Sequence, residues 1–326
     1  MIKIIRSNSS NYINKLNVFL EKRREGKNQD KALVKKILND VKKNKFKAVI
    51  KYELKFSKNR EMKLSNNRVN KVIKKLDPKV KKAIDFAYKR IFKFHSQQLK
   101  YLKNIYFEDK YKNILEHRNV PIDSVGIYVP GNLPSTLLMN SIPAKLAKVK
   151  RLVLATPKIN GNLNPAVLYV AKKVGIKEIY SLGGAQAIGS LAYIQKVSKI
   201  IGPGNKFVSE AKRQLSGKIV GTESMFAGPS EICVLADKAS NIDQIATSLI
   251  SQAEHDYDSQ CILITKNESV IKKVKKRIST LLKKLPRKKI ASRALKKHGL
   301  ILKVKNDKQI IESINTISTE HLELLV

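Results

Sequence analysis

The sequence of 326 residues has no tryptophan, two cysteines and few arginines, and each scarcity argues against a class of protein. Two cysteines do not suggest a disulfide framework, and Cys233 and Cys261 each lie in an apolar run, as small core residues do. No apolar run approaches the roughly 20 residues of a membrane-spanning helix, and the N-terminus lacks a continuous apolar signal core. We therefore expect a cytoplasmic protein.

Acidic residues are also scarce, at 26 against 66 basic residues, which gives a formal net charge of +40. Such a charge suits nucleic-acid binding, but only 12 of the basic residues are arginine. Proteins that recognise phosphate usually rely on arginine, because its planar guanidinium can form two hydrogen bonds to one phosphate. The lysines are spread along the whole chain, often as pairs on predicted helix surfaces. We interpret them as solvated faces in a composition typical of an AT-biased genome, and expect only non-specific, salt-sensitive binding of polyanions.

The hydrophobic pattern changes character once along the chain. Residues 1 to about 115 show helical spacing, and the pattern predicts helices over 31–45, 46–56, 66–75 and 78–101. From Val120 onward, predicted strands alternate with predicted helices in two series. The strands of the two series lie near 121–130, 151–155, 178–182 and 199–201, and then near 232–236, 261–265 and 299–304. This alternation predicts parallel sheets covered on both faces.

Three glycine-bearing turns follow strands of the first series, at 130–131, 183–184 and 202–205. They should cluster at the carboxyl edge of that sheet, where open α/β folds bind ligands. None has the G-x-G-x-x-G pattern of dinucleotide-binding proteins, and each alone can be a simple tight turn. Together they favour a ligand cleft, because polar residues adjoin them: Tyr128, Gln186 and Asn205. The turn at 183–184 opens a helix and could accept a phosphate on its backbone N–H groups.

A second candidate site lies in the stretch SQAEHDYDSQ (251–260). It ends a predicted helix that Asn241 can cap. Gln252 and His255 are three residues apart, so they share one helical face, and an imidazole with an amide oxygen can bind zinc. The spacing is no diagnostic metal motif, and a histidine at a helix end is more often a surface or capping group. Both readings stay open on spacing alone.

Six motifs in register resemble the histidinol dehydrogenase family over essentially the whole chain. They are VGIYVPG (125–131), GGAQAI (183–188), GPGNKFVSEAKRQ (202–214), AGPSE (227–231), SQAEHDYDSQ (251–260) and TEHLEL (319–324). The resemblance implies an α/β fold with two nucleotide-fold-like parallel-sheet domains and an N-terminal helical portion. We expect 1–125 with 231–326 to form the first domain, and 126–230 to form a second, NAD-contacting domain, with the active cleft between them.

The family oxidises L-histidinol through the aldehyde to L-histidine, the last step of histidine biosynthesis, and reduces two NAD⁺. The resemblance assigns roles by motif position. It gives NAD contacts to Tyr128, Gln186 and Asn205, substrate contacts to Ser230, Gln252, His255 and His321, zinc binding to Gln252 and His255, and catalysis to Glu320 and His321. An imidazole titrates near neutral pH and can take the hydroxyl proton, while a carboxylate can activate the water that adds to the aldehyde.

The sequence also departs from the family pattern. The loop at 131–135 is shorter, and Ser224 stands where the family usually has an aspartate. The family continues beyond TEHLEL with small C-terminal domains, which supply an aspartate and a histidine to the zinc site, the histidine from the partner subunit of a homodimer. We therefore expect residues 1–326 alone to form negligible NADH from histidinol. The alternative is an inactive remnant that keeps the fold and binds polyanions.

Overall fold

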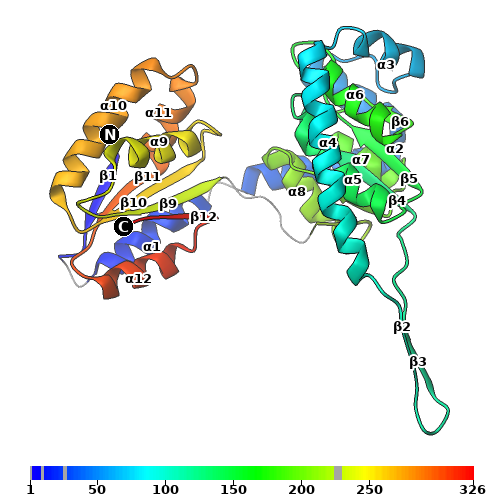
Figure 1. Cartoon of the computed structure of the whole chain (residues 1–326). Coiled ribbons are helices and arrows are strands. Elements are labelled where there is room, and N and C mark those ends of the chain that lie inside the picture. The colour runs from blue at the N-terminus through cyan, green and yellow to red at the C-terminus, as the bar shows by residue number, and fades with distance from the viewer. Residues whose placement is uncertain (1, 9–10, 25–27, 224–229) are drawn as a thin grey trace. The chain divides into compact units, whose positions relative to one another are not determined.

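The computed structural model describes residues 2–8, 11–24, 28–223 and 230–326. The chain divides into two compact units, with Met1–Asn28 and Gly228–Val326 in unit 1 and Gln29–Ala227 in unit 2. Each unit contains a five-stranded parallel sheet with helices on both faces (Figure 1). The predicted α/β class with two parallel-sheet domains is confirmed. Within the described ranges, no helix combines the length and apolar character that crossing a membrane requires.

The sheet of unit 1 has the strand order β1-β11-β10-β9-β12. Its strands are β1 (Lys3–Arg6), β9 (Glu231–Ala236), β10 (Gln260–Thr265), β11 (Gly299–Lys303) and β12 (His321–Leu325). One face packs against α9 (Ile242–Ala253), α10 (Glu268–Lys284) and α11 (Lys288–His298), and the other against α1 (Tyr12–Arg24) and α12 (Asp307–Ile317). The central strands β9, β10 and β11 are therefore buried on both faces, which explains why they read as continuous apolar runs.

The two cysteines lie on adjacent strands of this sheet but face opposite sides. Cys233 on β9 belongs to the core beneath α1 and α12, whereas Cys261 on β10 belongs to the core beneath α9 to α11. Both are buried, and they form no disulfide with each other. Burial raises the pKa of the Cys233 thiol to about 12. The expectation that both are core residues is confirmed.

The sheet of unit 2 has the strand order β6-β5-β4-β7-β8. Its strands are β4 (Ser124–Tyr128), β5 (Arg151–Ala155), β6 (Glu178–Tyr180), β7 (Lys199–Ile201) and β8 (Gly221–Thr222). One face packs against α2 (Asn28–Ser57), α7 (Gly184–Tyr193) and α8 (Lys206–Leu215). The other packs against α3 (Asn66–Ile73), α4 (Pro78–Gln98), α5 (Pro134–Leu146) and α6 (Pro165–Val174).

Residues 29–125 pack in unit 2, whereas the sequence led us to group them with the first domain. The apolar stripe of α2 explains the difference, because Val34, Val41 and Val49 are completely buried in one core with Ile188 of α7 and Ile200 of β7. The predicted break between two helices near residue 45 is present. Lys45 has a φ of 49°, which interrupts α2 at that point.

Two short features depart from the expected helical N-terminal region. β1 is a strand of unit 1, and a hairpin of β2 (Ile105–Glu108) and β3 (Ile114–His117) extends away from the rest of unit 2 (Figure 1). It follows the short 3₁₀ helix η2 (Leu99–Tyr101). Strands of four residues are too short to show a reliable alternation, and every residue of the hairpin strands is exposed. The helix α11 was also absent from the sequence prediction.

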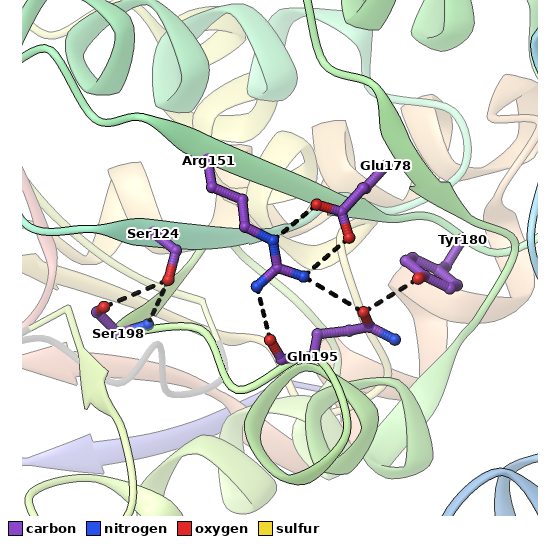
Figure 2. A network of polar contacts seen from close by, with 6 residues as sticks. All are labelled: Ser124, Arg151, Glu178, Tyr180, Gln195 and Ser198. Carbon is purple, nitrogen blue, oxygen red and sulfur yellow. Dashed lines mark hydrogen bonds and ion pairs between the residues drawn. The ribbon is translucent and has the colours of Figure 1, made fainter.

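A polar network ties together the amino ends of the unit 2 strands (Figure 2). Arg151 at the start of β5 donates through Nε and Nη2 to the two carboxylate oxygens of Glu178 on β6, at 2.7 and 2.8 Å. Its Nη1 donates to the carbonyl of Gln195 at 2.7 Å, and the Ser198 backbone N–H donates to the Ser124 hydroxyl at 3.0 Å. The network fixes the edge of the sheet opposite to the glycine turns.

Candidate functional site

The three glycine turns of unit 2 lie at the carboxyl edge of its sheet, as expected, and two of them contact Tyr128. This residue ends β4 and is buried. A Cβ on Gly202 would lie 2.0 Å from the Tyr128 carbonyl oxygen, and the Gly202 φ is +105°. Only glycine allows this close approach in this backbone conformation. Gly184 lies close to the Tyr128 phenol, so the turns and β4 form one connected cluster.

Glu53 of α2 occupies the N-terminus of α7. Its Oε1 accepts hydrogen bonds from the backbone N–H of Gly183, at 2.8 Å, and from Nε2 of Gln186, at 2.9 Å. Glu53 and Gln186 are 1% and 2% exposed, so this carboxylate is removed from solvent. The Gly183 N–H that could have received a phosphate therefore has a protein acceptor already. The sequence did not show this, because the acceptor comes from a helix 130 residues earlier.

Burial dominates the electrostatics of this cluster. It raises the pKa of the Glu53 carboxyl above its usual range, although hydrogen bonds from Gly183 and Gln186 act in the opposite direction. Burial also raises the pKa of Tyr128 to about 12; the Gly184 N–H lowers it and the Glu53 charge adds to the rise. Tyr128 is therefore a neutral hydrogen-bonding group at physiological pH.

The third predicted nucleotide residue, Asn205, caps α8. Its side-chain oxygen accepts the backbone N–H groups of Phe207 and Val208, at 3.1 and 3.2 Å. Lys212 of the same helix is 3% exposed, and its Nζ donates to the Gly202 carbonyl at 2.8 Å and pairs with Glu223. Through Lys212, α8 thus holds the Gly202 turn in place.

The predicted unit 1 residues lie at the amino edge of its sheet. Ser230 directly precedes β9, and its carbonyl accepts the N–H of Gln260, which begins β10, at 2.9 Å. Gln252 lies in the last turn of α9, whereas His255 lies two residues beyond its end, so the two do not share one helical face as predicted. His321 begins β12 and pairs in register with Ile232 of β9. The parallel topology therefore brings all the predicted substrate, metal and catalytic residues of this unit to one edge.

The α9 end has the donors expected for a metal but few of them. Asn241 caps α9 as predicted, Gln252 is buried, and His255 is exposed and donates its N–H to the Gln252 carbonyl at 3.2 Å. Among the described residues, no group of three or more histidine, cysteine, aspartate or glutamate side chains is placed to hold a metal ion. Gln252 and His255 suit zinc in their chemistry and contribute two donors.

Glu320 and His321 are both exposed. The Nε2 of His321 lies 4.0 Å from an Oε1 of Glu320, and more than half of each side chain is accessible. Both side chains are therefore accessible to water or to a ligand at this edge. The sequence did not predict β12, which holds the pair at the sheet edge.

Sequence reasoning missed Glu53 and Lys212. Both occupy positions on the buried face of a helix, Glu53 four residues after Val49 and Lys212 four residues after Val208. A charged residue at such a position must find a partner inside the protein, and that spacing was the available signal. Ser224 and the Ala227-Gly228-Pro229 part of one motif lie outside the described residues.

Comparison with known proteins decides the family. The family model described as Histidinol dehydrogenase matches residues 20–326. The chain belongs to the histidinol dehydrogenase family. It is 51% identical over 331 aligned positions to histidinol dehydrogenase of Pelagibacter ubique, covering 99% of this chain and 77% of that protein. The histidinol dehydrogenase family comprises oxidoreductases of histidine biosynthesis, and this kinship does not favour the alternative of a polyanion-binding remnant.

Other members of the histidinol dehydrogenase family match in the same way. Histidinol dehydrogenase 1 of Nostoc sp. is 46% identical over 247 positions, which cover 74% of this chain and 56% of that protein. The crystal structure of histidinol dehydrogenase from Elizabethkingia anophelis aligns with a TM-score of 0.81 at 34% identity and covers 100% of this chain and 76% of that one. This chain thus spans about three quarters of two of these relatives and just over half of the third.

Proposed function

We propose that this protein takes part in the NAD-dependent oxidation of L-histidinol, through the aldehyde, to L-histidine. The observation that carries the proposal is the 51% identity to a histidinol dehydrogenase across 99% of this chain. The structure supports it by gathering the motif residues of each unit at one edge of its sheet. The reaction removes two hydrides from the substrate carbon, reduces two NAD⁺, and consumes one water.

We assign nucleotide binding to the carboxyl edge of the unit 2 sheet. Tyr128 and Gln186 lie there in one hydrogen-bonded cluster, and Asn205 opens α8 after the neighbouring turn. The Gly202 and Gly183 turns lie at the edge where open α/β sheets bind their ligands. In this proposal the turns shape the nucleotide site, and the buried polar groups orient the nucleotide in it.

We assign proton transfer to Glu320 and His321 at the amino edge of the unit 1 sheet. His321 would accept the proton of the substrate hydroxyl and later that of the aldehyde hydrate, because an imidazole can be neutral near physiological pH. Glu320 would accept a proton from the water that adds to the aldehyde. Ser230, at the same edge, would hold the substrate.

Zinc is the metal proposed for this edge, with Gln252 of α9 and His255 of the turn after it among its ligands. When bound, zinc would orient the imidazole and amine of histidinol as a Lewis acid. The imidazole of His255 and the amide oxygen of Gln252 are donors that zinc accepts, and the two residues are three apart in the sequence.

Ligand binding is the test matched to a chain that spans 77% of its Pelagibacter relative. NAD⁺, L-histidinol and a short single-stranded RNA would each be titrated against the protein over a salt series. The proposal expects saturable binding of NAD⁺ and histidinol that changes little with salt, and RNA binding that weakens steeply with salt. RNA binding with no saturable NAD⁺ or histidinol binding would contradict it and would restore the polyanion-binding alternative.

We also propose that the protein is a cytoplasmic homodimer. The β2–β3 hairpin exposes more than half of Ile105, Phe107 and Leu115, and the helix before it, α4, exposes more than half of Phe86 and Phe94. An isolated two-stranded hairpin is marginally stable in water, and an apolar surface of this kind marks an interface. A second copy of the chain is the partner that would cover it. The buried thiol of Cys233 suits a reducing compartment.

A further inference from the structure

The buried carboxylate of Glu53 has an unusual position in so basic a chain. The sequence offers 66 lysines and arginines, yet the groups that hydrogen-bond the Glu53 carboxylate are neutral: the Gly183 N–H and the Gln186 side chain. A carboxylate buried among neutral donors costs free energy, since its hydration is lost without an opposite charge in return. A glutamine or an apolar residue would fill the position at lower cost.

The surroundings of Glu53 connect it to the turn at the carboxyl edge from two sides. Its carboxylate binds the Gly183 N–H directly. Asn59, two residues after α2, donates through Nδ2 to the Ser181 carbonyl at 2.6 Å, and the Ser181 N–H donates to the Met62 carbonyl at 2.6 Å. The end of α2 and the segment after it therefore hold residues 181–186 in place.

Gln186 has little freedom once this contact is made. Its Nε2 donates to Glu53, which directs its Oε1 toward Gly184, where a Cβ would meet that oxygen at 2.9 Å. Gly184 has a φ of +61° and lies close to the Tyr128 phenol. The orientation of the Gln186 amide and the shape of the turn therefore depend on the same carboxylate oxygen.

We infer that Glu53 is a positioning residue of the nucleotide site, which fixes Gln186 and the Gly183–Gly184 turn for NAD⁺ and closes the N-terminus of α7 to phosphate. The inference rests on the proposed NAD⁺ binding and deepens it. A carboxylate at a helix N-terminus occupies the place where a phosphate would otherwise bind, and it repels one. The diphosphate of the nucleotide accordingly binds elsewhere on this edge, and the Gly183 turn meets an uncharged or cationic part of the ligand.

The ionised form of Glu53 is the one that positions Gln186, because it can accept both hydrogen bonds on one oxygen. Protonation weakens these contacts, so NAD⁺ affinity falls as the pH is lowered through the raised pKa of this carboxyl. The other titratable group facing it is Tyr128 on β4, whose pKa of about 12 keeps it neutral over that range. The groups from α7 and from the segment after α2, Gln186 and Asn59, do not titrate.

The test compares Glu53→Gln with the wild-type chain and with the control Glu178→Gln, which alters a carboxylate at the opposite edge of the same sheet. NAD⁺ dissociation constants would be measured across the acid-to-neutral pH range, with thermal unfolding followed in parallel. Glu53→Gln should weaken NAD⁺ binding about tenfold at neutral pH and abolish the acid loss of affinity, while Glu178→Gln retains both. The unfolding midpoint of Glu53→Gln should equal that of the wild type or be higher, because the substitution removes a buried charge whose pKa is raised.

The outcomes separate this inference from the function on which it rests. If the wild-type chain binds NAD⁺ and Glu53→Gln binds it with the same affinity and the same pH profile, Glu53 has no positioning role and the inference is overturned. If a lower unfolding midpoint of Glu53→Gln accounts for its weaker NAD⁺ binding, the role of Glu53 is structural and the inference again fails. Absence of NAD⁺ binding by the wild-type chain would overturn the proposed function, and the inference with it.

Discussion

The guanidinium of Arg151 and the carboxylate of Glu178 form a bidentate ion pair that joins the amino ends of β5 and β6 (Figure 2). Nε and Nη2 of Arg151 each donate to one carboxylate oxygen. Both side chains are about one-third exposed, so water screens the pair only in part. The hydrogen bonds from Arg151 hold the pKa of Glu178 below its usual range. The pair therefore stabilises the folded state when Glu178 is ionised.

Replacing Glu178 by Gln should lower the free energy of unfolding by about 1 to 2 kcal/mol at neutral pH. Because the folded-state pKa is depressed, this contribution is present above the unfolded pKa and disappears as the pH falls through the folded value. Urea unfolding of wild type and variant at several pH values measures the difference. The matched control is Glu108→Gln, which breaks the more exposed pair with Lys112 in the β2–β3 hairpin. Equal losses in both variants at every pH would contradict the prediction.

Gly202→Ala should destabilise the chain by about 3 kcal/mol, because the new Cβ would lie 2.0 Å from the Tyr128 carbonyl at a positive φ. Gly217→Ala is the control, since Gly217 has a φ of +70° but no atom within 4 Å of its Cβ position. That variant should lose only the left-handed backbone preference, about 1 kcal/mol. Denaturant unfolding gives both values. If Gly202→Ala were as stable as Gly217→Ala, the prediction would be wrong, because the turn would have to accommodate the new Cβ at little cost.

Phe107→Asp should convert the proposed dimer into a monomer, because it places a charge in the exposed apolar strand β2. Ile311→Asp is the control, at an equally exposed apolar position on α12 of unit 1. Size-exclusion chromatography with light scattering measures the molar mass of each protein directly. Wild type and Ile311→Asp should show twice the mass of one chain, and Phe107→Asp a single mass. A dimer that survives in Phe107→Asp would place the interface elsewhere.

His255→Ala should weaken zinc binding roughly tenfold or more, because it removes one of the two proposed zinc ligands near the end of α9. His95→Ala is the control, since His95 on α4 forms a hydrogen bond of 2.7 Å with Gln98 of the same helix. Competition with a chromogenic chelator measures the affinity of each protein for zinc without relying on activity. Identical affinities for the two variants would remove His255 from the metal site.

The success of the sequence prediction followed the length and burial of each element. Strands β5, β9, β10 and β11 lay within one residue of the predicted bounds, because they are apolar runs in buried sheet interiors. The predicted clustering of the glycine turns also held, since parallel strands end at one edge. The exposed hairpin β2–β3 and the edge strands β1 and β12 gave no such pattern, and they were missed.

The sequence by itself determined the α/β class, the two parallel sheets, the family and the motif residues that the proposed chemistry needs. Only the tertiary structure decided that residues 29–125 pack on the second sheet and that Glu53 reaches the turn at Gly183. The physical reason is the range of the interactions. Periodicity and turn chemistry act over a few neighbouring residues, whereas the partner of a buried charge is chosen by the packing of segments far apart in the chain.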